Sequence, residues 1–134
     1  MSANDQVEDV LNDDSNDPLA GVMRGLRAEY LGEAPERVRE ISAALGRLRT
    51  GEFGALDELQ RYFHRLAGSG GSYGFPLITD RSRTAEHVMQ ELAATERPLE
   101  RADFAVIEQH VLGVADAFRD AQRMFDQGPP PGSG

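Results

Sequence analysis

The clearest pattern in the chain lies in residues 53–76, FGALDELQRYFHRLAGSGGSYGFP. Its large apolar side chains recur at helical spacing and fall on one broad arc of a helical wheel: Leu56, Leu59, Tyr62, Phe63, Leu66 and Tyr73. This periodicity predicts an amphipathic helix over residues 53–72 whose apolar arc faces a core. Gly74, Phe75 and Pro76 follow, and they predict the end of that helix.

The opposite side of this helix carries polar residues and glycines at the same spacing. We call it the His64 stripe: Asp57, Gln60, Arg61, His64, Gly68 and Gly71. The pattern predicts that His64 is exposed in mid-helix. Each glycine inside a helix costs up to about 1 kcal/mol relative to alanine, so a run of glycines after His64 needs a reason. Another backbone could approach closely there. The alternative is a frayed helix end beside an ordinary solvated histidine.

The segments on both sides also read as helices. Residues 18–30 place Leu19, Val22, Met23, Leu26 and Tyr30 at helical spacing. Further helices are predicted over residues 35–51 and 76–94, and a last one begins at Asp103, whose side chain would cap it. Residues 95–102 contain a proline and are predicted to form a loop. We therefore expect an all-α fold, an antiparallel four-helix bundle with an additional short N-terminal helix packed across one end.

Composition limits both the organisation and the class of function. Residues 1–17 are predicted to be a disordered acidic tail, residues 18–126 the helical bundle, and residues 127–134 a flexible Pro/Gly tail. The net charge of -9 argues against nucleic acid as a partner. All 14 basic residues are arginine, and there is no cysteine. No stretch is long and apolar enough for a membrane span, so a cytoplasmic protein is expected.

The segment from His64 to Gly74 resembles the signature of the histidine phosphotransfer (HPt) domain family. The shared features are a leucine two residues after the histidine, a glycine four residues after it, a run of small residues and a glycine ten residues after it. Ile78 fits the later aliphatic position, and Ala85 with Glu86 resembles a pair in the following helix. The resemblance covers roughly residues 18–125.

This resemblance implies a phosphocarrier in a two-component phosphorelay. His64 would be the phosphoacceptor, and it would exchange a phosphoryl group with an aspartate of a response-regulator receiver domain, a hybrid sensor histidine kinase, or both. Neutral imidazole suits the task, since its unperturbed pKa of about 6.5 leaves it nucleophilic near pH 7. Asp57, Gln60, Gly68 and Gly71 would dock the partner. No cofactor, no metal and no kinase activity of its own are expected.

One departure from the family concerns the position three residues after the histidine. A lysine is usual there and would lie near the phosphoryl oxygens, whereas this chain has Ala67. Arg61 and Arg65 are the candidates to supply the missing charge. The departure leaves open an alternative function, a non-phosphorylated HPt-like adaptor that only binds a receiver or kinase domain. A purely structural bundle is a third, weaker reading.

Other chemical signals are weaker. Residues 70–74 match the G-x-S-x-G motif of serine hydrolases, but that motif needs a preceding strand and a large sheet. The glycines form no Walker loop, because the required lysine is absent. His87 and His110 are expected to be ordinary helix-surface residues, and Glu86 a surface or packing residue.

Overall fold

The computed structural model describes residues 18–128 of the chain, and every regular element in that range is a helix. The elements are α2 (Pro18–Gly32), α3 (Ala34–Arg49), α4 (Gly54–Ser72), α5 (Pro76–Ala94) and α6 (Arg101–Gln127). This confirms the predicted all-α fold, and the described part contains no strand. The tail predicted over residues 1–17 lies outside the described residues, as does the tail predicted over residues 127–134 apart from its first two residues. Gln127 still belongs to α6 and Gly128 follows it, so the helix runs one residue into the predicted tail.

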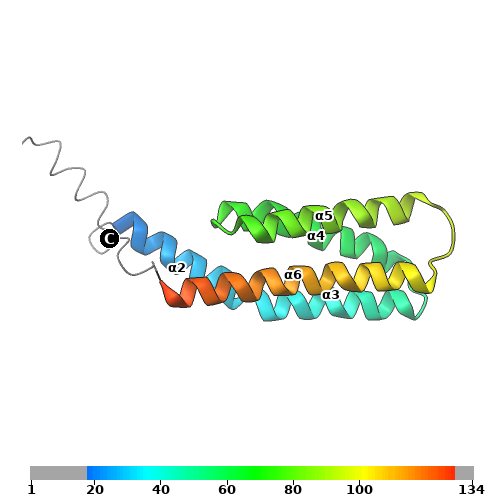
Figure 1. Ribbon diagram of the computed structural model, residues 1–134, viewed down its shortest axis with the longest axis horizontal. Helices are drawn as coiled ribbons and strands as arrows, with labels where there is room; N and C mark the ends of the chain where they lie inside the picture. Colours follow the sequence, from blue (N-terminus) through cyan, green and yellow to red (C-terminus); the bar gives the residue numbers. More distant parts are fainter. Residues whose placement is uncertain (1–17, 129–134) are drawn as a thin grey trace, which may run out of the picture.

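Helices α3 to α6 form an antiparallel bundle. The α4–α5 hairpin lies over α3 and α6, and short connections join successive helices (Figure 1). The fully buried side chains come from all four helices, and they include Ile41, Leu48, Leu59, Phe63, Ile78, Met89, Ile107 and Val114. The arc predicted for α4 is the arc that enters this core, since Leu59, Phe63 and Leu66 are buried there.

The first described helix departs from its expected packing. Helix α2 leads almost directly into α3. It projects past the α4–α5 hairpin instead of crossing the end of the bundle (Figure 1). Its 15 residues also make it nearly as long as α3, which has 16. Only Tyr30 and Leu31 are buried, while Val22 is 57% and Leu26 39% exposed. The apolar spacing of this segment therefore predicted the helix correctly, but it did not predict whether the apolar face would be packed against the bundle.

The turn between α4 and α5 follows from Gly74 and Pro76. Gly74 has a φ of +85°, a conformation that favours glycine, and Pro76 opens α5 at a position that needs no N–H donor. The N–H of Phe75 donates to the carbonyl of Gly70 at 2.7 Å. The ring of Tyr73 stacks on Tyr30 with centroids 4.5 Å apart. The predicted break is confirmed, and α2 holds it in place.

Helix α5 packs directly against the backbone of α4 at Gly70. A Cβ added there would lie 2.9 Å from the Ile78 side chain and from the backbone nitrogen of Thr79. The buried hydroxyl of Thr79 accepts from the N–H of Gly71 at 2.6 Å and donates to the carbonyl of Ala67 at 2.7 Å. These two backbone groups are four residues apart, so the Thr79 side chain of α5 is hydrogen-bonded to two successive turns of α4.

This contact predicts opposite effects for two glycine-to-alanine changes. Gly70→Ala should lower the free energy of unfolding by about 1–2 kcal/mol, because the overlap outweighs the gain in helix propensity. Gly68→Ala should raise it by about 0.5–1 kcal/mol, since a Cβ there meets nothing within 4 Å. Urea titration of both variants checks the pair. Equal changes in the same direction would contradict the close approach at Gly70.

Helix α6 begins two residues earlier than predicted, and Asp103 is not its N-cap. Glu100 takes the N-cap position, and its N–H donates to the Asp103 carboxylate at 2.7 Å. Arg97 donates to both oxygens of the same carboxylate, at 2.6 and 3.0 Å. The Arg97 hydrogen bonds, followed by that from Glu100, lower the pKa of Asp103 to about 2. Asp103 therefore joins the connection after α5 to the first turn of α6.

The lowered pKa predicts acid-sensitive stability. A carboxylate with a folded pKa near 2 and an unfolded value of about 3.9 contributes its full stabilisation above pH 4, and this contribution is lost as the pH falls from about 4 to 2. Asp103→Asn should therefore unfold at a lower temperature than the parent at pH 6, and the difference should shrink toward pH 2. Thermal melts across this range check the prediction. A constant difference would contradict it.

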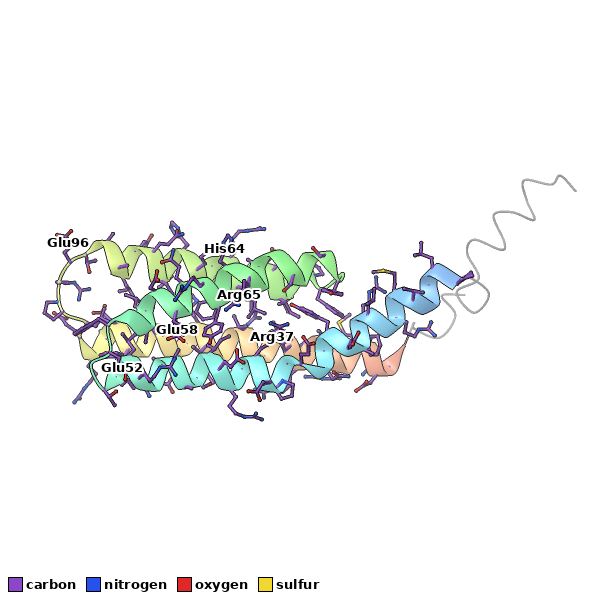
Figure 2. The ribbon with its side chains drawn as sticks, turned by 180° about the vertical axis from the view of Figure 1, so that it is seen from behind. Arg37, Glu52, Glu58, His64, Arg65 and Glu96 are labelled. Atoms are coloured by element: carbon purple, nitrogen blue, oxygen red, sulfur yellow. The ribbon has the colours of Figure 1, made fainter. Side chains whose placement is uncertain are left out.

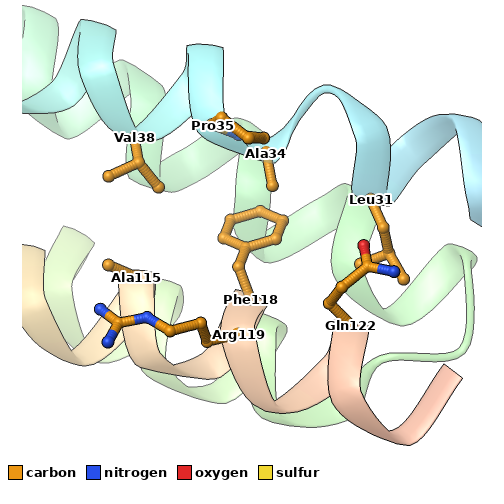
Figure 3. Close-up of a pocket in the computed structure, with 8 residues that line it drawn as sticks. All are labelled: Leu31, Ala34, Pro35, Val38, Ala115, Phe118, Arg119 and Gln122. Carbon is orange, nitrogen blue, oxygen red and sulfur yellow. The ribbon is translucent and has the colours of Figure 1, made fainter. Parts of the chain in front are cut away.

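Helices α3 and α6 leave a shallow apolar groove of about 290 Å³ near the start of α3. Phe118 projects between the two helices there, with Val38 and Ala34 across from it (Figure 3). None of the residues that line this groove belongs to α4 or α5. It is therefore separate from the surface that carries His64.

Candidate functional site

His64 lies near the middle of α4 and points outward from the bundle (Figure 2). Its side chain is 73% exposed, while the preceding residue, Phe63, is fully buried. Successive side chains on a helix differ in direction by about 100°. Because Phe63 points into the core, His64 points toward the surface. The predicted exposure of His64 is confirmed.

The His64 imidazole is hydrogen-bonded to a side chain of α5, that of Glu86. The Nδ1 atom lies 2.7 Å from a carboxylate oxygen of Glu86. That carboxylate is largely screened from solvent, with 17% of its side chain exposed. A carboxylate can only accept, so it selects the tautomer with the proton on Nδ1 and leaves the Nε2 lone pair facing solvent. Glu86 was expected to be a surface or packing residue, and its hydrogen bond to His64 was not predicted.

The register of the hairpin explains why these two residues meet. His64 lies eleven residues before Phe75 and Glu86 lies eleven after it. Gly71 and Thr79, which are hydrogen-bonded, lie four residues before and four after the same point. With the helix break predicted at residues 74–76, this symmetry could have paired His64 with Glu86 from the sequence alone.

The two arginines near His64 have other partners. Arg61 lies 3.8 Å from the carboxylate of Asp57, one turn earlier. The guanidinium of Arg65 lies 5.1 Å from the centre of the Tyr62 ring, a distance that suits a cation–π contact. Both arginines are exposed. Both arginines line one open depression together with His64, so the structure places positive charge near the histidine but does not bring it into contact with the imidazole.

The rest of the His64 stripe is accessible to varying degrees. Asp57, Gly68 and Gly71 are exposed, whereas Gln60 is half-buried. Gly68 follows His64 by one turn, with open space where a side chain would stand. Ala67 is turned inward and is only 9% exposed, so a longer side chain there would have to run along the helix surface to reach solvent.

The other two histidines lie in different surroundings. His87 is exposed and its Nε2 lies 2.9 Å from Glu91, one turn away on α5. His110 is half-buried on α6, and this burial lowers its pKa. Within residues 18–128, no three His, Asp or Glu side chains cluster as a metal site would require. None of the described helices combines the length and apolar character needed to cross a membrane.

Comparison with known families agrees with the all-α fold. The sequence model of the Hpt domain matches residues 25–121, a range that runs from α2 through most of α6. No curated protein and no solved structure showed a significant match. The matched range covers well over half of the chain and contains both His64 and Glu86. The chain belongs to the Hpt domain family.

Proposed function

We propose that this chain is a phosphocarrier that holds a phosphoryl group on Nε2 of His64 and exchanges it with the aspartate of a receiver domain. Hpt domains in general take part in histidine phosphotransfer. The observation that carries the proposal is the exposed imidazole whose Nδ1 is engaged by Glu86. This arrangement fixes the ring, and it leaves one nitrogen free to react.

The chemical step follows from that arrangement. The Nε2 lone pair attacks the phosphorus of an aspartyl phosphate in line, an N–P bond forms, and the P–O bond to the aspartate breaks. The aspartate leaves as a carboxylate, so no proton has to move. The ring gains positive charge, and the Glu86 carboxylate 2.7 Å from Nδ1 stabilises it. In the reverse direction a receiver carboxylate attacks the same phosphorus and the N–P bond breaks.

The alternative is an adaptor that binds a receiver or kinase domain without carrying phosphate. Two observations favour it: Ala67 offers no charge, and the contacts of Arg61 and Arg65 are with Asp57 and Tyr62. The carrier is nevertheless better supported, because an adaptor would not need a carboxylate that orients the imidazole.

One experiment separates the two functions. The protein is first treated with phosphoramidate, a small donor that needs no partner, and is then mixed with unphosphorylated receiver domains from its own organism. A carrier should gain acid-labile phosphate and lose it to at least one receiver. If a receiver binds but the chain neither gains nor loses phosphate, the adaptor function replaces the carrier.

The charge around the phosphoryl group gives a further prediction. A phosphoryl group adds about two negative charges at neutral pH, and Arg61 can reach them from one turn away. Arg61→Ala should therefore lower phosphoryl acceptance or phosphohistidine lifetime several-fold, since an exposed pair contributes only about 0.2–1 kcal/mol. Arg65→Ala should do less, because its guanidinium lies over Tyr62. Ala67→Lys should increase acceptance or lifetime.

Decay of labelled phosphohistidine at two salt concentrations measures these effects. The differences should narrow at high salt, because screening weakens exposed pairs. Equal decay and acceptance in the parent and all three variants would show that no side chain near His64 compensates for the absent lysine.

A further inference from the structure

The His64 stripe continues toward the start of α4 and ends at an aromatic residue. Phe53, Asp57, Gln60 and His64 follow one another at spacings of four, three and four residues, so they share one side of the helix. Phe53 is 66% exposed, although it is large and apolar. Its backbone is already helical, with a φ of -65° and a ψ of -24°.

Phe53 forms one wall of an apolar groove between the start of α4 and the end of α5. The groove has a volume of about 280 Å³. Leu56, Leu92 and Leu99 contribute its apolar floor and walls, and Gln60 lines it on the side nearest His64. Glu96, which also lines the groove, has a φ of +56°, a strained conformation for a residue other than glycine.

The distance from His64 to this groove matches the size of a protein interface. Phe53 lies eleven residues before His64, or about 16 Å along a helix. A specific interface buries about 800 Å² on each partner, which corresponds to a disc of roughly 16 Å radius. A receiver domain that places its aspartate at His64 would therefore reach the groove without any further partner.

We infer that this groove is the second anchor point of the receiver domain and receives an apolar side chain from it. The inference rests on the proposed carrier function. Interfaces draw most of their affinity from a few apolar or aromatic residues seated in pockets, and apart from Phe53 this side of α4 offers only polar groups and glycines. The anchor would supply affinity away from the reacting histidine, so that transfer chemistry and partner choice depend on different residues.

The test compares Phe53→Ser with Leu112→Ser, a matched change of an exposed apolar residue on α6. Both variants are phosphorylated with phosphoramidate. Transfer of the phosphoryl group is then measured to a receiver domain that accepts it from the phosphorylated parent. Because phosphoramidate is too small to need the groove, both variants should load like the parent. Phe53→Ser should bind the receiver at least tenfold more weakly and transfer correspondingly more slowly below saturation, while Leu112→Ser should match the parent.

Each other result overturns the inference. If Phe53→Ser binds the receiver and transfers phosphate like the parent, the groove is not a receiver anchor. The same conclusion follows if Leu112→Ser loses as much receiver affinity as Phe53→Ser. If the parent itself neither loads nor transfers, the proposed function fails and the inference fails with it. If the parent is a dimer in sedimentation and Phe53→Ser is a monomer, the groove is occupied by a second copy of the chain.

Discussion

Replacing His64 by glutamine is expected to abolish phosphorylation of the chain, whether the donor is phosphoramidate or a phosphorylated receiver. Glutamine is similar in size and polarity but has no nucleophilic nitrogen, so no N–P bond can form. The side chain is 73% exposed, so its replacement removes little packing. Circular dichroism should show the same helicity as in the parent, and the melting temperature should change little.

The other two histidines provide the controls. His87→Gln and His110→Gln should retain full labelling, because neither residue lies on the His64 stripe. His87 is as exposed as His64, at 70%, so it also tests whether exposure alone is sufficient. Labelling that survives in His64→Gln, or that is lost in His87→Gln, would contradict the assignment of the phosphoacceptor.

Replacing Glu86 by alanine is expected to slow phosphoryl acceptance by about tenfold. A hydrogen bond to a charged group contributes about 1.5–3 kcal/mol, and the exposed position of His64 places the effect toward the lower end of this range. A barrier change of about 1.4 kcal/mol is a factor of ten in rate. Without Glu86 the ring rotates freely and its proton is no longer held on Nδ1.

The Glu86→Gln variant separates orientation from charge. Its amide oxygen can still accept the Nδ1 proton, so the ring stays oriented, but the negative charge that stabilises the phosphorylated ring is lost. We expect acceptance between that of the parent and that of Glu86→Ala, with a shortened phosphohistidine lifetime in both variants. Thermal melts control for folding. If both variants accept and hold phosphate like the parent, Glu86 has no positioning role.

The sequence predicted the features that repeat within one helix. The arc of α4, the exposure of His64 and the end of the helix at Gly74 were all expected, because each depends only on local spacing and backbone chemistry. Periodicity did not reveal what a helix packs against. Leu26 belongs to a good apolar face, yet α2 runs past the hairpin and leaves this side chain partly exposed.

The features that were missed depend on contacts between helices. Glu86 and Thr79 lie on the side of α5 that faces α4, and a single helical wheel does not show which neighbour that side meets. Gly70 looked like one glycine among three in the run after His64, but it is the one that allows the close approach. Asp103 was expected to be a cap because aspartate favours that position. Its hydrogen bonds with Arg97 and Glu100 instead place it inside the first turn.

The most direct test of the carrier function follows one phosphoryl group into the chain and out again. The protein is loaded with isotopically labelled phosphate, the modified residue is identified by mass spectrometry under mild alkaline conditions, and an unphosphorylated receiver domain is then added. For a carrier, label is expected on His64 alone, followed by its loss from His64 and its appearance on the receiver aspartate. Label on His87 or His110, or label that no receiver removes before it hydrolyses, would contradict it.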